Sequence, residues 1–423
     1  MFEAINSFKK RKFSNTKKNL KIELFFSPLL VIPLGLVFIS SLLIQSVQRQ
    51  LPQTDSLNHL ITGLLGYFLA IIISYIPLQR IKNYVMPIYF LSIVFLIQIY
   101  FFGITISGAQ RWLSLGFFSF QPSELAKLAT LLGIAFVLER RNINSLKDLL
   151  KPFIVVTIPW ILIFFQPDLG TSLVLIFLLL VMLYWAQMPV EWIFIFIFSI
   201  ITALFSFVSD VILFLWVPFM GLLAYRSFHK KLLFSLSTMF FHILVAKLTP
   251  LLWNFGLKDY QKDRLILFLD PGIDPLGGGY HLLQSKIAIG SGGLLGSGLL
   301  NGKLTNLQFI PEQHTDFIFS ALGEEGGFIG TMLVIIMFFT LILQLIKIAK
   351  NARSDFESLV IIGIAAIFLF QIITNIYMTI GLGPITGIPL PFMSYGRTSL
   401  LINFVFIGLS LSALKRCRSL RKT

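Results

Sequence analysis

Long apolar runs, each about as long as a bilayer is thick, recur along the whole 423-residue chain. A helix needs about 20 predominantly apolar residues to cross the hydrocarbon core of a membrane. Two of the candidate spans, the fifth and the eighth, are short, so the count is ten to twelve. The twelve candidates are 26–47, 58–78, 84–102, 123–139, 152–165, 170–187, 192–209, 211–225, 232–252, 318–346, 358–380 and 394–413. The sequence therefore predicts an all-α polytopic membrane protein with re-entrant segments.

The composition differs from that of soluble globular proteins. Charged residues make up 13% of the chain and the mean hydropathy is +0.85, which is typical of polytopic membrane proteins. The single cysteine, Cys417, excludes an intrachain disulfide. We expect no cleavable signal peptide, because the N-terminus is a basic arm and no small-residue cleavage site follows the first apolar run.

The basic residues predict the orientation. They gather in the arm "KKRKFSNTKKNLK", at Arg80 and Lys82, and in "RRNINSLKDLLK", "RSFHKK", "KIAKNAR" and "KRCRSLRKT", which lie on alternate connections. These segments hold 24 of the 34 Lys and Arg residues, so the positive-inside rule makes them, and both termini, cytoplasmic. The net charge of +15 is then explained by topology and anionic lipid, and we expect no nucleic-acid partner.

The domain organisation follows from this topology. We expect a cytoplasmic arm (1–25), one transmembrane domain (26–415) and a cytoplasmic tail (416–423). The connection 253–315 then lies outside, and it contains the polar, turn-rich stretch "DPGIDPLGGGYHLLQSKIAIGSGG". Within this connection, "NFGLKDYQKDRLILFLD" predicts an amphipathic helix on the membrane surface, and "YHLLQSKIAIG" has apolar residues at helical spacing.

Several polar groups stand where lipid would exclude them. Glu124 and Lys127 are three residues apart near the start of a span that we expect Ser123 to cap, so they share a face. Two charges at that depth must pair with each other or face a polar cavity. The segments "QPDLGTS", with Asp168, and "GLGPITGIPLPFMSYGRTS" are similar breaks, and irregular backbone near a membrane needs protein or water around it. Together they predict an outward-facing polar cavity.

A last polar segment, "FIPEQHTDFIFSALGEEGG", raises the question of a metal. Glu312, His314 and Asp316 precede a span, and Glu324 and Glu325 lie about two turns inside it. His-x-Asp with nearby acids is a metal-ligand pattern, but no second histidine is spaced to help. Helix capping by Thr315 and Asp316 is the simpler interpretation. We therefore predict no metal site, and Mg²⁺ or Mn²⁺ is an alternative that these residues leave open.

The order of five motifs carries a resemblance. "GAQRWLSLGFFSFQPSELAKLA", "QPDLGTS", "DPLGGGYHLLQSKIAIGSGGLLGSG", "FIPEQHTDFIFSALGEE" and "GLGPITGIPLPFMSYGRTSLL" occur in the order expected of the SEDS (shape, elongation, division and sporulation) glycosyltransferases of bacteria. The chain resembles this family from about the first span to the last. The segment "QSKIAIGSGG" resembles the RodA branch more than the FtsW branch.

This resemblance implies a function. It implies polymerisation of lipid II into glycan strands at the outer face of the bacterial cytoplasmic membrane, in cell-wall elongation. It also implies a class B penicillin-binding protein as the transpeptidase partner, together with other membrane proteins of the elongation complex. The family's essential aspartate lies in a "DPxGxGY" element, which here is "DPLGGGY", so Asp274 is the implied catalytic residue and Asp270 is its local rival.

Glycan elongation needs a base for the acceptor hydroxyl and cations for the departing lipid pyrophosphate. Asp274 is the expected base, and partial desolvation in a cavity would strengthen it by raising its pKa. Lys127 neutralising Glu124, Lys286 standing in solvent, and Trp112 anchoring at the interface are simpler alternatives for three of the remaining candidates. The candidate substrate-binding residues are Arg111, Trp112, Glu124, Lys127, Lys286, His314, Ser394 and Arg397.

Two departures from the family pattern limit what carries over. The family usually has about ten spans, whereas this chain is expected to carry an extra helix pair within 192–252. Arg397 stands where the family typically has glycine in "SYGG". Two other functions stay open from the residues: a transporter, or flippase, for a lipid-linked precursor, and a noncatalytic scaffold of the elongation or division machinery. The concentration of unusual residues on one side favours the enzyme.

Overall fold

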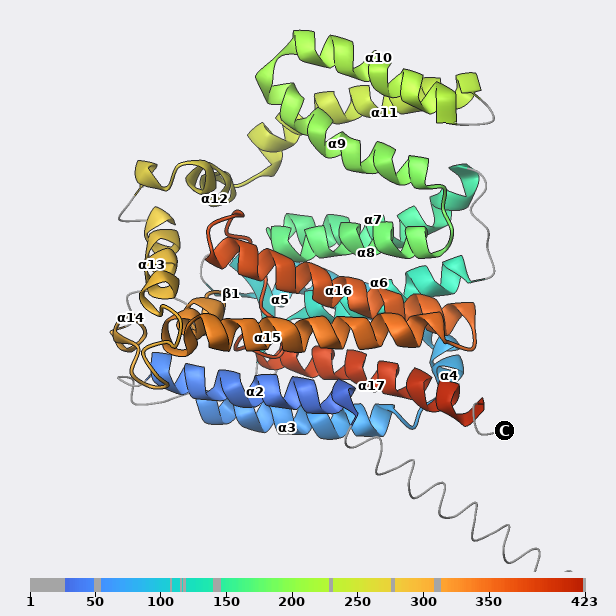
Figure 1. Ribbon diagram of the computed structural model, residues 1–423. Helices are drawn as coiled ribbons and strands as arrows, with labels where there is room; N and C mark the ends of the chain where they lie inside the picture. The colour runs from blue at the N-terminus through green and yellow to red at the C-terminus, as the bar shows by residue number, and fades with distance from the viewer. Residues whose placement is uncertain are drawn as a thin grey trace, which may run out of the picture.

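The computed structural model describes most of the chain, in nine segments. These are residues 27–48, 55–106, 109–114, 116, 119–139, 146–227, 231–274, 278–307 and 313–420. The axes of most long helices are roughly aligned in Figure 1, and the C-terminus lies at the end of the bundle opposite to α12 and α13. Glu312 and the Pro-Leu-Gly of "DPLGGGY" fall outside the described residues.

Each of the twelve predicted spans contains one helix. They are α2 (Pro28–Val47), α3 (Ser56–Ile73), α5 (Val85–Phe102), α6 (Pro122–Leu138), α7 (Leu146–Phe165), α8 (Leu169–Trp185), α9 (Val190–Val208), α10 (Asp210–Ser227), α11 (Lys231–Leu251), α15 (Ile318–Lys350), α16 (Asp355–Thr379) and α17 (Arg397–Leu420). By length and composition, nine helices of the described residues can cross a membrane. The other three of the twelve are α6 and α8, with 17 residues each, and α10, with 18. The prediction of an all-α polytopic protein is confirmed.

The smaller elements lie between these helices. They are α4 (Leu78–Lys82), β1 (Ile104–Ile106), β2 (Ala109–Ser114), β3 (Ser119–Phe120), the π-helix η1 (Leu252–Gly256), α12 (Asp259–Leu269), the 3₁₀-helix η2 (Pro271–Ile273), α13 (Gly278–Ser291) and α14 (Lys303–Asn306). The three strands form an antiparallel sheet in the order β1-β2-β3. The segment expected to be a large loop is thus largely helical, and both of the helices predicted in it are present as α12 and α13.

The centre of the bundle is formed by α16 and α17. In each of them 72% of the apolar segment is buried, compared with 11% in α9. Small residues let α17 approach its neighbour α3, because a Cβ added at Gly66 would lie 2.4 Å from the ring of Phe404. Close approach through glycine is how helices pack in a lipid environment, where dispersion rather than the hydrophobic effect drives association.

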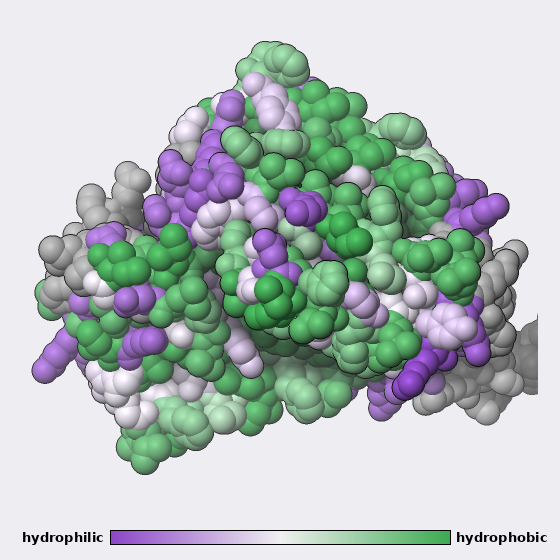
Figure 2. Space-filling model, turned by 90° about the horizontal axis from the view of Figure 1, so that it is seen from above, coloured by the Kyte–Doolittle hydropathy of each residue, from purple (hydrophilic) through white to green (hydrophobic). Residues whose placement is uncertain are grey.

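Helices α9, α10 and α11 form a module to one side of the bundle, where the extra helix pair is expected (Figure 1). Ser209 has extended backbone angles (φ −169°, ψ 134°), so α9 and α10 are two helices rather than one. A buried hydrogen-bonded cluster joins the three, since Thr202 Oγ1 lies 2.6 Å from His242 Nδ1 and 3.0 Å from Trp216 Nε1. Figure 2, which looks down on this side, shows a mostly hydrophobic surface with hydrophilic residues gathered toward both ends.

A glycine-rich loop locks the start of α15. The helix is interrupted at Gly327, where the backbone is left-handed (φ 59°). The loop supplies partners for backbone groups near this interruption. Ser297 N donates to Glu324 O at 2.9 Å, and Phe328 N donates to Gly293 O at 2.9 Å. The glycine run after α13 is therefore a structural insert, and its glycines are needed for this backbone-to-backbone approach.

The two buried acids of α15 support the same loop. Glu324 accepts hydrogen bonds from Leu304 N (2.8 Å) and Thr305 N (2.9 Å), and Glu325 accepts one from Leu300 N (3.0 Å). Buried carboxylates are stabilised when several donors share their charge. These acids hold the connection before α15 rather than facing the cavity described below.

Two expected helix caps are wrong. Helix α6 begins at Pro122 after Gln121, and Ser123 Oγ instead donates to Asp168, a tertiary contact. Helix α15 begins at Ile318, and Phe317 rather than Thr315 or Asp316 occupies its N-cap position. At α6 a proline occupies the first helical position, which proline favours, so the helix begins before Ser123 rather than after it.

Candidate active site

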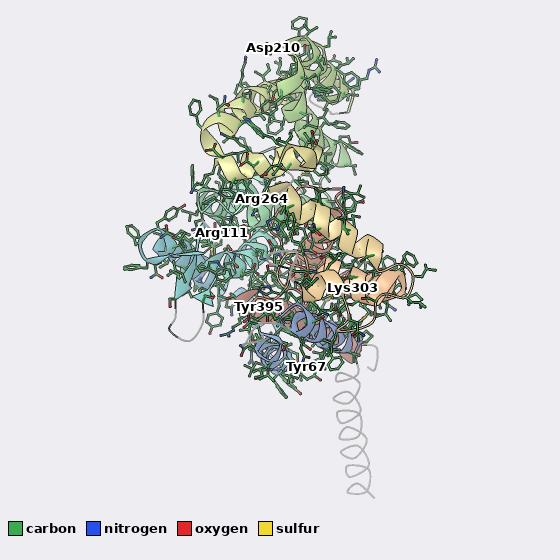
Figure 3. The ribbon with its side chains drawn as sticks, turned by 90° about the vertical axis from the view of Figure 1, so that its left-hand side faces the viewer. Tyr67, Arg111, Asp210, Arg264, Lys303 and Tyr395 are labelled. Carbon is green, nitrogen blue, oxygen red and sulfur yellow. The ribbon has the colours of Figure 1, made fainter. Side chains whose placement is uncertain are left out.

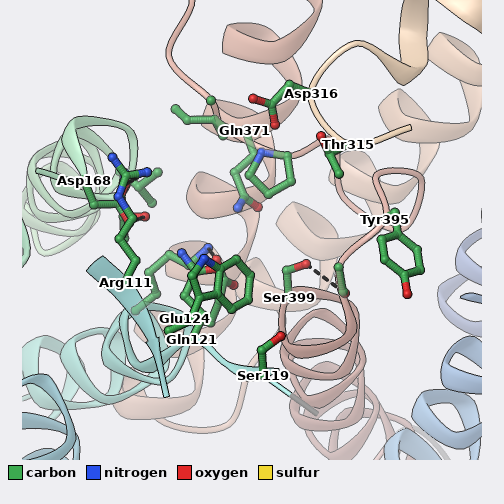
Figure 4. A pocket seen from close by; sticks show the side chains of 18 of the residues that line it. Arg111, Ser119, Gln121, Glu124, Asp168, Thr315, Asp316, Gln371, Tyr395 and Ser399 are labelled. Carbon is green, nitrogen blue, oxygen red and sulfur yellow. Dashed lines mark hydrogen bonds and ion pairs between the residues drawn. The ribbon is translucent and has the colours of Figure 1, made fainter. Parts of the chain in front are cut away.

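A cavity of about 660 Å³ lies near the end of the bundle that carries the small sheet and α12. Its wall combines β2, β3, α6, α8, α12, α16 and the start of α17 with the segments around residues 315 and 388. Figure 4 shows part of this wall, with Arg111 and Glu124 among its labelled side chains. Six of the candidate substrate-binding residues line the cavity: Arg111, Trp112, Glu124, Lys127, His314 and Arg397. The predicted polar cavity is therefore present.

Arg111 and Asp168 face each other across one side of the cavity (Figure 4). Strand β2 carries Arg111, whose Nη1 lies 3.9 Å from Asp168 Oδ1 and whose other nitrogens donate to the carbonyls of Gln166 and Pro167. Asp168 is the N-cap of α8 and accepts from Thr171 N at 3.1 Å. The helix start thus holds the carboxylate, and the carboxylate and two carbonyls hold the guanidinium in place.

Lys127 and Glu124 form the buried ion pair that their spacing predicts. Lys127 Nζ lies 2.8 Å from Glu124 Oε1, and the side chains are 1% and 2% exposed. Oε2 of Glu124 has no hydrogen-bond partner in the part of the chain that the structure describes. Because a buried carboxylate oxygen without a donor is costly, this atom is suited to accept a hydrogen bond from a water or a substrate hydroxyl in the cavity.

Tyr395 connects the cavity to the first helical hairpin. Its hydroxyl donates to Asp55 Oδ1 at 2.9 Å, and its backbone N–H donates to His314 O at 3.0 Å. Burial raises the pKa of Tyr395, and the hydrogen bond to Asp55 raises it further. For Asp55, burial acts to raise the pKa, but hydrogen bonds from Tyr395, Gln48 and Asn58 outweigh it and lower the pKa below its usual value.

Asp274 lies in a neighbouring cavity of about 510 Å³. Tyr260 and Arg264, one turn apart on α12, line both cavities. The Asp274 side chain is exposed, so the desolvation that we expected to strengthen this base is not present in this structure. Its backbone carbonyl accepts from Gly279 N at 3.0 Å, which joins it to the start of α13.

Asp270, the local rival of Asp274, has a structural role. Its Oδ1 accepts from Gly272 N at 3.0 Å and so closes the turn at η2. Asp270 does not line either cavity, whereas Asp274 lines the second one. The geometry therefore favours Asp274 among the two acids.

Two predicted substrate contacts lie outside both cavities. Lys286 is exposed on α13, with its side chain against Gly381. Ser394 is buried, and its hydroxyl accepts from Leu390 N at 2.7 Å, which closes the turn before Tyr395. Ser394 is placed to shape the cavity loop, and Lys286 corresponds to the solvated alternative.

A metal site finds no support among the residues that can be described. No group of three or more His, Cys, Asp or Glu side chains gathers closely enough there to hold an ion. His314 and Asp316 both line the main cavity, and Glu312 lies outside the described residues. The two that are placed belong to the wall of a large polar cavity.

The sequence assigns no role of their own to some wall residues. Asp168 and Tyr395 lie in two of the breaks that predict the cavity, but neither is a predicted substrate contact. Arg264 and Tyr260 lie in "DYQKDRLILFLD", which was recognised only as an amphipathic helix. Their spacing of four on one helical face was the available signal. In the end-on view of Figure 3, Arg111, Arg264 and Tyr395 lie between the α9–α11 module and the α2–α3 hairpin.

The chain is similar to two named relatives over most of its length. Peptidoglycan glycosyltransferase MrdB of Escherichia coli (strain K12) is 35% identical over 349 residues, covering 82% of each chain. Peptidoglycan glycosyltransferase RodA of Treponema pallidum (strain Nichols) is 32% identical over 421 residues, covering 92% of this chain and 96% of that protein.

Solved structures are similar along the same length. A chain from a peptidoglycan synthase complex that coordinates polymerization and crosslinking has a TM-score of 0.70 and 27% identity, covering 92% of this chain and 97% of that one. Rod shape determining protein RodA of Thermus thermophilus, at 24% identity, shares the fold with a TM-score of 0.59, covering 92% and 95%. The profile described as cell cycle protein, FtsW/RodA/SpoVE, matches residues 22–227 and 214–419. The chain therefore belongs to the FtsW/RodA/SpoVE family.

Proposed function

We propose that this protein is a peptidoglycan glycosyltransferase that polymerises lipid II at the outer face of the bacterial cytoplasmic membrane. The observation that carries the proposal is the pair of adjoining cavities, one lined by cations and the other by Asp274. Relatives named peptidoglycan glycosyltransferase support the reaction class, since they match over most of both chains. The expected orientation, with both termini cytoplasmic, would place the cavities on the side of the flipped substrate.

The chemistry asks two things of the protein. The hydroxyl oxygen of the acceptor sugar forms a bond to the anomeric carbon of the donor sugar, while the bond from that carbon to the pyrophosphate oxygen breaks. Asp274 would take the proton of the acceptor hydroxyl. The lipid pyrophosphate leaves with the bonding electrons, and the cations of the main cavity would stabilise its charge.

The wall of the main cavity supports substrate positioning. Arg111 and Lys127 are each held by a carboxylate, so their positions are set before the substrate arrives. Trp112, next to Arg111, offers a flat apolar face for a sugar ring or a prenyl chain. Arg397, which replaces the glycine typical of the family, adds a further cation at the start of α17.

A partner is part of the proposal. We expect a class B penicillin-binding protein to crosslink the strands made here, and other membrane proteins of the elongation complex to join it. The support is the similarity to a chain of a peptidoglycan synthase complex. The choice of elongation over division rests on the resemblance of "QSKIAIGSGG" to the RodA branch.

Polymerisation of labelled lipid II by the purified protein tests the function. We expect glycan strands with the wild type, more of them when the penicillin-binding partner is present, and none with Asp274→Asn. A transporter would make no glycan and would instead move lipid II across the membrane of sealed vesicles. A scaffold would do neither, and its cellular role would survive Asp274→Asn.

A further inference from the structure

Helix α12 separates two cavities, which share two side chains among the residues that the structure describes. Tyr260 and Arg264 line both the main cavity and the cavity of Asp274. They are four residues apart and therefore lie on one face of the helix, where the Arg264 guanidinium stands 5.6 Å from the centre of the Tyr260 ring. In a transfer between two lipid-linked sugars, a side chain that lines both cavities would lie next to the leaving pyrophosphate and to the attacking hydroxyl of the acceptor.

The position of α12 is fixed by the same loop that holds Arg111. Tyr260 Oη donates to Pro167 O at 3.1 Å, and Gln261 Nε2 donates to the same carbonyl at 3.3 Å. Pro167 O also accepts from Arg111. At the far end of the helix Leu267 is 7% exposed and anchors it by packing. Arg264 thus stands on a helix that is held at both ends, which keeps its donors in place.

The charge distribution of the cavity singles out Arg264. Arg111 and Lys127 lie within ion-pair distance of Asp168 and Glu124. Arg264 forms no ion pair of that kind with any carboxylate that the structure describes. Its guanidinium carries five N–H donors in a plane, a pattern that matches two phosphate oxygens at once.

The backbone at Gly387 lies beside the Arg264 side chain. Gly387 has a left-handed conformation (φ 67°), and a Cβ built there would lie 3.5 Å from both Arg264 Nη1 and Asp316 Oδ2. Arg264 and Asp316 therefore converge on the same point of the wall. Asp316 brings negative charge to this part of the wall, and no ion pair joins it to Arg264 in the part of the chain that the structure describes.

From these observations we infer that Arg264 binds the pyrophosphate of the lipid-linked donor, at the boundary between the cationic cavity and the cavity of Asp274. The inference rests on the proposed function, because it names the ligand group of the same site. The bond to the anomeric carbon breaks toward this pyrophosphate, so Arg264 would receive the charge that develops on the leaving oxygen. It acts by direct contact with the substrate.

Binding of two prenyl lipids to the purified full-length protein tests the inference. The probes are undecaprenyl pyrophosphate and undecaprenyl phosphate, which differ in one phosphate. We expect the wild type to prefer the pyrophosphate by about tenfold or more, Arg264→Ala to lose that preference, and Arg264→Lys to keep part of it because a point charge remains. A misplaced helix would weaken both lipids equally and would leave their ratio unchanged.

Lys262→Ala is the matched control, because Lys262 is a cation of the same helix whose recorded ion pair is with the exposed Asp259, and it lines neither cavity. We expect it to keep the wild-type preference and polymerisation rate. Arg264→Ala should lower the rate roughly 10²- to 10³-fold, as loss of a donor to a developing oxyanion does. Should Arg264→Ala fail to fold, Arg264→Lys carries the comparison, with a reduced ratio as its expected result.

Two failures are distinguishable. If Arg264→Ala and Arg264→Lys retain the wild-type preference, the inference is overturned while the polymerase proposal stands. If the wild type makes no glycan from lipid II, the proposed function fails, and the ratio of the two lipids still reports whether Arg264 recognises a pyrophosphate.

Discussion

The hydroxyl of Tyr395 donates a hydrogen bond of 2.9 Å to Oδ1 of Asp55, across 340 residues of sequence. Asp55 is the residue before α3, and Tyr395 lines the main cavity just before α17. This contact fastens the cavity loop to the α2–α3 hairpin. Helices α3 and α17 also pack closely along their length, so the hydrogen bond extends that interface to the cavity rim.

Removal of this hydrogen bond should destabilise the protein. Tyr395→Phe keeps the ring and leaves the Asp55 carboxylate with one donor fewer, which we expect to cost about 2 kcal/mol of unfolding free energy. Unfolding of the detergent-purified protein measures it. In a double-mutant cycle with Asp55→Asn, the two losses should be clearly non-additive, and strict additivity would show that the contact contributes nothing.

Asp55 should also make stability depend on acid. Its pKa is lowered in the folded state, so its contribution is fully present above the unfolded value of 3.8 and is lost as the pH falls through the lower folded value. We expect the unfolding midpoint of the wild type to fall in that acidic range. Asp55→Asn, measured over the same pH series, should show a smaller fall, and equal slopes would contradict the role of Asp55.

The Glu124–Lys127 pair predicts an unusual order of stabilities. Glu124→Leu or Lys127→Leu strands one buried charge, at a cost of about 3–5 kcal/mol, whereas the double apolar replacement strands none. We therefore expect the double variant to be more stable than either single variant. Thermal unfolding ranks the three, and a double variant that is the least stable would exclude a self-contained pair.

Activity separates a structural from a functional role of the same pair. A stable double variant that does not polymerise lipid II would show that Lys127 or Glu124 also contacts the substrate. Full polymerisation by that variant would show that the pair is purely structural.

The two acids of the "DPGIDP" segment should behave differently. Asp274→Asn should abolish polymerisation while expression and membrane insertion stay normal, because it removes the proposed base. Asp270→Ala removes the 3.0 Å turn contact to Gly272 N and should lower the unfolding midpoint slightly with activity retained. The reverse pattern, with Asp270→Ala inactive and Asp274→Asn active, would move the base to Asp270.

Sidedness can be read from single cysteines in a Cys417→Ser background. Lys258, Ser297 and Arg353 are all exposed, so a thiol at each is accessible to a reagent on its own side. A membrane-impermeant reagent on intact cells should label the first two positions and not the third. Labelling at position 353 alone would show that the topology is inverted, and it would contradict polymerisation at the outer face.

The sequence by itself determined the positions of the long helices, one ion pair of the cavity wall and the family. Apolar runs located the twelve long helices of the described residues, because bilayer-spanning length and composition are local properties. The spacing of Glu124 and Lys127 predicted their ion pair, since three residues on a helix make two side chains neighbours. The motif order identified the family and pointed to Asp274.

Only the tertiary structure decided what meets in the cavity. Arg111 meets Asp168, and Tyr395 meets Asp55, across long stretches of chain that no helical period relates. Ser123 was expected as a cap because capping is local, but its hydroxyl binds Asp168 from another helix. Arg264 looked like one charge of an amphipathic helix. It lines two cavities because hydrogen bonds to the Pro167 carbonyl anchor α12 beside them. No local sequence pattern predicts these hydrogen bonds.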